Sequence, residues 1–373
     1  IMLVVTLVAS VVLSSNRISL AQAPTFGILA LALGTTAVTN SWDAPLCAGL
    51  ILGACIWAAA IRADGRRLSI VGAGLLTLLA AYVMFLPFFS RFYSVVGDVS
   101  RTNAGSPLGQ FLTVWGIFLA IIVVAATVDA INSGSTANRV RQEALGVGVA
   151  CLVAGTVAFI FMAIRGNEIS AGGFVALWIA ATLLGIGALV HVPSKFGIAG
   201  IGLAVAAAAA TGAISGYRPA AAVALALGVV SLGYVIRLQP ARALPWAIIG
   251  VGAALLAGVE VVYVTDDLSG GDWQRMNTVF KFYNQTWLLL AAGAALLLVD
   301  LLVRSRAPHA DDVDDTSASH AAFNSEPSAA TRELRVSRLA TIVGFTVLAL
   351  GLIYPLLGTP SRLAQDMPSS PNH

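Results

Sequence analysis

Residue types that could do chemistry gather first in a short polar segment, residues 40–45. This segment holds Asn40, Trp42 and Asp43 and is followed directly by an apolar run. A carboxylate here is suited to act as a catalytic acid or base, while the Asn40 amide and the Trp42 ring suit the binding of a polar substrate. The structural alternative is a capped tight turn, with Asp43 or Ser41 capping the next helix and Trp42 anchoring the membrane interface.

A second polar segment, residues 91–107, carries Arg91 and Arg101. Arg binds phosphate through two parallel hydrogen bonds, so both residues are candidates for holding a phosphate-bearing substrate. Arg at a membrane boundary also anchors to lipid headgroups. Both interpretations are open from the sequence.

A third segment, residues 266–287, mixes acidic, basic, amide and aromatic side chains. Asp267, like Asp43 of the first segment, is a candidate for orienting a sugar or a divalent ion. Candidates for binding the substrate are Arg275, Asn277, Lys281 and Tyr283. A helix is expected to begin near Asp272, and the alternative to a phosphate site is an interfacial helix with its cations toward headgroups. Because Arg275 and Lys281 are six residues apart, they do not share one helix face.

Glu260 lies inside the apolar run that precedes this third segment. An ionisable side chain within a span indicates function by default, so Glu260 is a further catalytic candidate. A hydrated or paired Glu260 is the structural alternative. The cysteines, Cys47, Cys55 and Cys151, lie in apolar runs without metal-ligand spacing, so they identify no metal site.

The elements that must position these residues are expected to be membrane-spanning helices. Of 373 residues, 58% are hydrophobic and 10% are charged, whereas soluble domains carry roughly 25% charged residues. The net charge of +3, without a basic run interleaved with aromatics, gives no indication of nucleic-acid binding. Only helices or closed barrels satisfy the backbone in lipid, and the long continuous runs lack the alternation of barrel strands.

The apolar runs predict an all-α, polytopic transmembrane bundle of about 12 spans. They are residues 1–14, 24–39, 45–61, 69–89, 108–131, 144–164, 171–191, 197–215, 219–236, 245–263, 285–303 and 339–357. Residues 1–303 are predicted to form the multi-span domain, 304–338 an acidic disordered loop, and 339–373 the final helix with a short tail. The first run begins without an initiator Met, so an N-terminal part is expected to precede it.

The orientation follows from the distribution of Lys and Arg. These residues are about twice as frequent in one set of alternate loops, which includes Arg62, Arg139 and the loop 304–338, as in the other set. The richer side is predicted to be cytoplasmic in a multi-pass protein of the cell membrane. The three polar segments then share the extracytoplasmic face, where they are expected to form one outward-opening site.

Four motifs carry a family resemblance. They are TNSWDAP at residues 39–45, FLPF at 85–88, SPLGQF at 106–111 and RMNTVFKFYNQTW at 275–287. The chain resembles the YYY-type family of polytopic membrane proteins, which is grouped with the GT-C glycosyltransferases. It departs from the family pattern at Asn284, where a second Tyr is usual, and at residues 46–47.

The resemblance implies a GT-C-like fold and a sugar donor carried on a polyprenyl phosphate. It also implies that the main catalytic carboxylate lies in a loop before residue 1, in a missing N-terminal segment or a partner subunit. The expected function is glycosyl transfer, in which Asp43, Asp267 or Glu260 supplies the carboxylate and the cations steady the leaving phosphate. The alternatives are a transporter or flippase for a lipid-linked substrate and a non-catalytic membrane scaffold.

Overall fold

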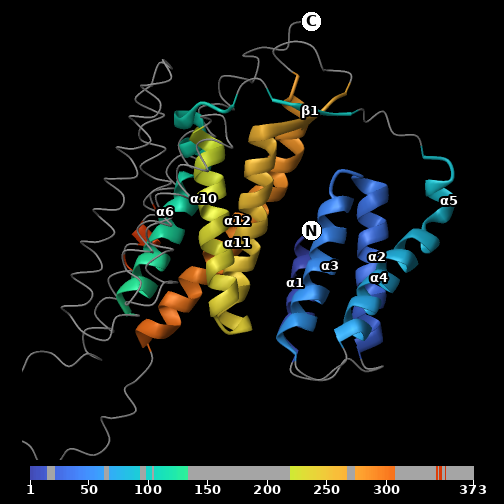
Figure 1. Ribbon diagram of the computed structural model, residues 1–373, viewed down its shortest axis with the longest axis horizontal. Coiled ribbons are helices and arrows are strands. Elements are labelled where there is room, and N and C mark those ends of the chain that lie inside the picture. The colour runs from blue at the N-terminus through green and yellow to red at the C-terminus, as the bar shows by residue number, and fades with distance from the viewer. Residues whose placement is uncertain are drawn as a thin grey trace, which may run out of the picture. The chain divides into compact units, whose positions relative to one another are not determined.

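The computed structural model describes residues 1–14, 22–62, 67–92, 98–102, 105–132, 219–266 and 274–306, with residues 342, 344–346 and 349 near the C-terminus. These residues form helices and one small β-ribbon (Figure 1). In chain order the elements are α1 (Met2–Leu13), α2 (Ala23–Thr39), α3 (Ala44–Ile61), α4 (Arg67–Met84), α5 (Leu86–Phe89), β1 (Val99–Arg101), α6 (Leu108–Asn132), α10 (Pro219–Arg237), α11 (Pro240–Val261), β2 (Val262–Val264) and α12 (Met276–Arg306).

Five of the described helices are long and apolar enough to cross a membrane: α3, α4, α6, α11 and α12. Helices α1 and α2 and the apolar part of α10 are shorter. The prediction of a multi-span helical membrane protein is therefore confirmed. The predicted spans 144–164, 171–191 and 197–215 lie outside the described residues, as do nearly all of 339–357 and most of the loop 304–338.

One predicted span, residues 69–89, is two helices. Helix α4 ends at Met84 and the four-residue α5 begins at Leu86, with Pro87 in its first turn. A proline at this position lacks the N–H that a continuous helix would donate, and its ring would clash with the carbonyl oxygen four residues earlier. The chain therefore breaks at Phe85, which redirects the aromatic end of the run.

Two other boundaries differ from the prediction. Helix α11 begins at Pro240, five residues before the predicted start at residue 245, and Pro245 lies inside it. At its other end, residues 262 and 263 were expected to be helical but belong to β2 (Val262–Val264). This strand pairs antiparallel with β1 in the register Val99↔Val264, Ser100↔Tyr263 and Arg101↔Val262. The prediction of an all-α protein is wrong in this detail.

The start of α12 also differs. A separate interfacial helix was expected to begin near residue 272 and to precede a span at 285–303. Instead, one helix runs from Met276 to Arg306. Its 31 residues measure about 46 Å, which is longer than the roughly 30 Å hydrocarbon core of a bilayer. The polar residues near its N-terminus are therefore part of the same rigid helix as the span.

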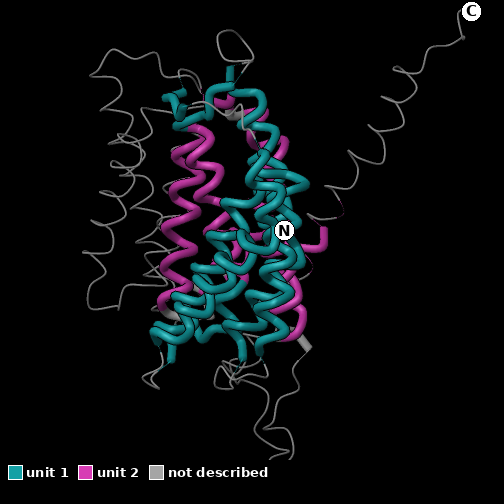
Figure 2. The backbone as a smooth tube through the Cα atoms, turned by 90° about the vertical axis from the view of Figure 1, so that its right-hand side faces the viewer, with its two compact units in different colours: residues 1–103, 238–244, 261–289 teal, residues 104–237, 245–260, 290–373 magenta. Residues whose placement is uncertain are grey.

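The chain divides into two compact units, coloured separately in Figure 2. Unit 1 contains residues 1–103, 238–244 and 261–289, and unit 2 contains residues 104–237, 245–260 and 290–373. Helices α11 and α12 contribute residues to both units. All three polar segments of the sequence therefore belong at least in part to unit 1.

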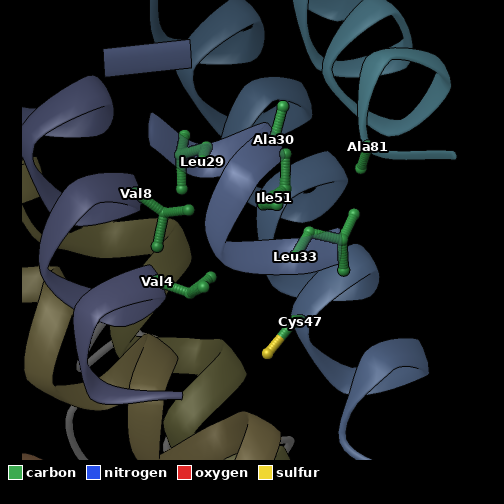
Figure 3. Close-up of a cluster of buried hydrophobic side chains, with 8 residues drawn as sticks. All are labelled: Val4, Val8, Leu29, Ala30, Leu33, Cys47, Ile51 and Ala81. Atoms are coloured by element: carbon green, nitrogen blue, oxygen red, sulfur yellow. The ribbon is translucent and has the colours of Figure 1, made fainter. Parts of the chain in front are cut away.

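The core of unit 1 is built by α1, α2, α3 and α4. A cluster of buried side chains joins them, shown in Figure 3: Val4, Val8, Leu29, Ala30, Leu33, Cys47, Ile51 and Ala81. Arg62 closes the end of α1, because its Nη2 donates to the carbonyl oxygens of Val11 at 3.1 Å and Ser14 at 2.6 Å. A cation at a helix C-terminus also interacts favourably with the helix dipole.

Unit 2 is held by close helix contacts. The ring of Tyr234 on α10 stacks on Trp246 of α11, with centroids 3.9 Å apart, and both side chains are fully buried. The Tyr234 hydroxyl donates to the carbonyl oxygen of Ala126 on α6. Gly293 of α12 lies so close to Ile249 of α11 that a Cβ there would overlap the Ile249 side chain. Small residues allow such close approach in membrane helices.

Candidate functional site

The polar turn before α3 sets the position of the Asp43 carboxylate. Helix α2 ends at Thr39, and the Asp43 N–H donates to the Asn40 carbonyl oxygen at 3.0 Å, which closes a tight turn. Asp43 occupies the N-cap position of α3 and Pro45 lies in the first turn. The structural alternative is thus met by the tight turn but not by Asp43 as a cap, because its side chain makes no capping hydrogen bond. The carboxylate accepts a hydrogen bond from another helix instead.

The donor is Gln285 of α12, which also belongs to unit 1. The Gln285 Nε2 donates to Asp43 Oδ1 at 2.7 Å and to the Trp42 carbonyl oxygen at 3.1 Å. A hydrogen bond to an ionised carboxylate is shorter and stronger than a neutral one. Among the described residues, no group donates to the other carboxylate oxygen, Oδ2. Asp43 is therefore an oriented, half-buried carboxylate with one oxygen held and one available.

An aromatic contact supports the same junction. The rings of Trp42 and Phe282 meet edge to face, with centroids 5.9 Å apart and an interplanar angle of 79°. Phe282 and Gln285 are three residues apart on α12, so they lie on one face of that helix. Trp42 is thus held from both its backbone and its ring. Its indole is half-buried and belongs to the residue that directly precedes Asp43 in the chain.

The second polar segment pairs, within unit 1, with the strand that directly precedes the third. Thr265 donates from its N–H at 2.8 Å and from its hydroxyl at 2.7 Å to the Asp98 carbonyl oxygen, which extends the pairing of β1 with β2. Arg101 is exposed at the end of β1, and Arg91 is exposed just after α5. The structure places these two cations at the surface and shows no contact of either with the Asp43 junction.

The start of α12 is tied to the end of β2. The Val264 N–H donates to Thr278 Oγ1 at 3.0 Å. The Asn277 side-chain amide donates to Asp266 Oδ2 at 2.8 Å. Asn277, a predicted substrate-binding residue, therefore has a partner within the protein that closes the loop between β2 and α12. Asp267 lies outside the described residues.

Two predicted cations flank the beginning of α12. Arg275 is half-buried in the turn before the helix, and its carbonyl oxygen accepts the Val279 N–H. Lys281 is half-buried one turn before Gln285, on the same face of α12. Its Nζ lies 6.0 Å from the centroid of the Phe280 ring and forms no ion pair with the described residues. Tyr283, also half-buried, lies between Lys281 and Gln285 along the helix.

Glu260 has a structural partner in unit 2. The side chain is fully buried at the end of α11. Its Oε2 accepts the Ser106 N–H at 2.7 Å, and its Oε1 accepts the Ser106 hydroxyl at 2.8 Å. Ser106 precedes α6, so the carboxylate satisfies backbone and side-chain donors at the start of that helix. The paired alternative for Glu260 is the one that the structure supports.

Several buried polar residues were not identified as candidates from the sequence. They include Gln285, Thr286, Ser231 and Asp129. Asp129 lies near the C-terminal end of α6 within a predicted span, and its charge alone was a usable signal. Gln285 and Ser231 carry no charge, and their burial follows from tertiary packing. Their importance therefore could not be read from residue type.

An apolar groove of about 340 Å³ lies beside the polar turn within unit 1. It is lined by residues of α2, α3, α4 and α5 with the turn that starts α3 and Phe92. These are Leu33, Gly34, Ala37, Ser41, Ala44, Pro45, Ala48, Leu78, Ala81, Tyr82, Phe89 and Phe92. The small side chains of α2 and α3 make the groove, and the aromatic rings of Tyr82 and Phe89, stacked at 5.2 Å, border it. Ser41 places one end of this apolar groove next to the Asp43 turn.

The described residues do not fit a divalent ion at Asp43. No group of three or more His, Cys, Asp or Glu side chains lies close together in the described part of the chain. The nearest partner of Asp43 Oδ1 is an N–H donor, which competes with a metal for that oxygen. The chemistry considered for this site therefore depends on the carboxylate and on the nearby cation.

These features define an integral membrane protein of apolar helices with a polar junction at the N-termini of α3 and α12. The chain belongs to the family described as "Uncharacterized membrane protein (DUF2298)", which matches residues 1–290. No curated protein and no solved structure matches the chain significantly. The matched range contains all three polar segments, so membership of a multi-span membrane protein family is established, whereas the activity is open.

Proposed function

We propose that the protein takes part in glycosyl transfer from a polyprenyl-phosphate-linked sugar at the extracytoplasmic face. The observation that carries this proposal is the junction at α3. It combines an oriented carboxylate on Asp43, the indole of the preceding residue Trp42, and the cation of Lys281, which has no ion pair among the described residues and lies one turn from Gln285. An acid or base, a stacking surface and a phosphate partner are the parts that such a transfer needs.

In the proposed reaction an acceptor hydroxyl attacks the anomeric carbon of the donor sugar. The new bond forms between the acceptor oxygen and that carbon, and the bond from the carbon to the phosphate oxygen breaks. The polyprenyl phosphate leaves with the electron pair, and Asp43 Oδ2 takes the proton of the hydroxyl. In this proposal Lys281 stabilises the charge that develops on the leaving phosphate, an effect that is often the largest catalytic term.

The apolar groove supports a substrate with a lipid chain. Its lining is almost wholly apolar, and one end lies at Ser41, two residues from Asp43. For a polyprenyl chain that came from water, burial in the groove would contribute a favourable free energy of roughly 25 cal/mol per Å² of covered surface. Because the chain comes from the bilayer, the groove contributes mainly position and shape to the complex.

The transporter alternative has less support. Its principal feature in the sequence was Glu260, and that carboxylate accepts two hydrogen bonds from Ser106. A group held in this way is suited to anchor the start of α6. A scaffold would bind no phosphate lipid specifically, so the same experiment separates it from the proposed enzyme.

The test is binding of undecaprenyl phosphate to the purified chain in lipid nanodiscs. The Lys281→Ala variant is expected to bind about tenfold more weakly, because a charged hydrogen bond of roughly 1.5 kcal/mol is lost. The double variant Arg275→Ala/Lys281→Ala should lose at least as much affinity. Arg67→Ala is the matched control, since it removes an exposed cation from the start of α4. Equal affinity of all four proteins would reject the phosphate site and favour the scaffold.

A further inference from the structure

The side-chain amide of Gln285 has a fixed orientation. Its Nε2 faces two acceptors, the Trp42 carbonyl oxygen and Asp43 Oδ1. A carbonyl oxygen cannot donate, and neither can an oxygen of an ionised carboxylate. Exchanging the amide nitrogen and oxygen would place Oε1 against two acceptors and lose both hydrogen bonds. The hydrogen-bond network therefore decides which atom of the amide points where.

This orientation leaves the Gln285 oxygen without a donor. Oε1 is buried, the whole side chain is 0% exposed, and no described residue donates to it. A buried acceptor without a hydrogen bond destabilises a protein, because it has given up its contact with water and gained no partner. The hydrogen bonds to Trp42 and Asp43 both use Gln285 Nε2. They do not explain why residue 285 also carries a buried oxygen.

We propose that Gln285 is a substrate-positioning residue whose Oε1 accepts a hydrogen bond from a hydroxyl of the sugar while its Nε2 holds Asp43. The inference rests on the proposed function and adds to it the residue that recognises the sugar. The amide joins the two halves of the site. One side orients the carboxylate that takes the proton, and the other recognises a hydroxyl donor.

The nearby groups suit a polyhydroxyl ligand. Trp42, held by its ring contact with Phe282 and its backbone contact with Gln285, is half-buried and precedes Asp43 in the chain. Asp43 Oδ2 is a second acceptor at the same junction. An aromatic face with two acceptors matches the apolar face and the hydroxyl donors of a hexose ring. It matches a bare phosphate poorly, because a phosphate is repelled by acceptors and needs donors.

The test compares undecaprenyl phosphate with undecaprenyl phosphates that carry glucose, galactose, mannose or N-acetylglucosamine, bound to the full chain in nanodiscs. The wild-type chain should bind at least one sugar-bearing lipid about tenfold more tightly than the bare carrier, the value of one well-placed hydrogen bond. In Gln285→Met this preference should vanish, while affinity for the bare carrier changes less than about twofold.

A second variant separates sugar recognition from support of the turn. Gln285→Lys keeps donors for Trp42 and Asp43 but has no acceptor, so it should fold like the wild type and still lose the preference. Asn284→Ala, at an exposed neighbour, is the control and should keep it. An unchanged preference in both Gln285 variants, or a wild type that binds the sugar-bearing lipids no more tightly than the bare carrier, would overturn this inference alone. A wild type that binds none of the lipids would overturn the proposed function as well.

Discussion

The N-terminus of α3 shows that a residue's place in a helix does not by itself decide its partner. Asp43 stands at the N-cap, where a carboxylate normally accepts a backbone N–H of the first turn. Its Oδ1 instead accepts from Gln285, a residue 242 positions later. This partner turns the carboxylate toward α12 and leaves Oδ2 available. The proposed acid–base role depends on that reorientation.

Replacing Asp43 with asparagine tests that role at the residue scale. The asparagine side chain would keep an oxygen for the Gln285 amide, so the turn should survive, but it cannot take a proton. We expect transfer of sugar from a polyprenyl-phosphate donor to fall by about 10²–10⁴-fold. Donor affinity should change little. The measurement is release of undecaprenyl phosphate by wild-type and variant protein in nanodiscs.

The result also separates two origins of the catalytic carboxylate. The family resemblance implies a carboxylate in a loop before residue 1, whereas our proposal assigns the role to Asp43. If the Asp43→Asn variant transfers sugar at the wild-type rate, Asp43 only stabilises the turn before α3, and another group is the general base. Gln285 would then hold the turn and not the reacting group.

At the scale of elements, packing between α2 and α4 depends on a glycine. A Cβ on Gly34 of α2 would overlap the ring of Phe85, the residue at which the chain breaks between α4 and α5. Gly34 also lines the apolar groove. The absence of a side chain at this position therefore lets the aromatic end of α4 approach α2.

Gly34→Ala should consequently destabilise the protein. We expect a loss of about 1–3 kcal/mol in the free energy of unfolding, the usual cost of overpacking. Gly27→Ala, on the same helix, meets no atom within 4 Å and should not lower stability. Thermal unfolding in one detergent measures both. Combining Gly34→Ala with Phe85→Ala should remove most of the additional cost of the alanine, and failure to do so would exclude the ring as its cause.

At the scale of the whole molecule, segments far apart in the sequence combine into unit 1. The first and third polar segments meet through Asp43 and Gln285, and β1 of the second segment pairs with β2, the strand that directly precedes the third segment. One direct contact between segments therefore agrees with the expectation of a shared site, which stays a prediction. The face of the membrane on which this unit's polar end lies follows from the charge distribution and stays a prediction.

Membrane sidedness can be measured by cysteine labelling. In a background without the native cysteines, Ser41→Cys should react in intact cells with a membrane-impermeant thiol reagent, because Ser41 is exposed in the turn before α3. Gln239→Cys, exposed in the connection between α10 and α11, should react only after the membrane is opened. The reverse pattern would place the Asp43 junction in the cytoplasm and contradict the predicted orientation.

The sequence by itself determined the class of the protein and most helix positions in the described residues. Backbone groups in lipid must be paired within the segment, so a long apolar run has to be a helix, whatever its neighbours. The polar segments were visible for the same reason, because they interrupt those runs. A helix near residue 272 was expected, but its continuity with the span at 285–303 was not, since the polar first turns of α12 carry no apolar signal.

Only the tertiary structure decided which polar side chains are hydrogen-bonded within the protein and which keep a polar atom without a partner among the described residues. Glu260, a candidate from its charge, is held by Ser106, and Asn277 is held by Asp266. Gln285, an uncharged residue, holds Asp43 and keeps a buried oxygen to which no described residue donates. Such pairings depend on how helices pack across long sequence separations. Small and apolar side chains leave that packing unspecified, because lipid solvates them as well as a neighbouring helix does.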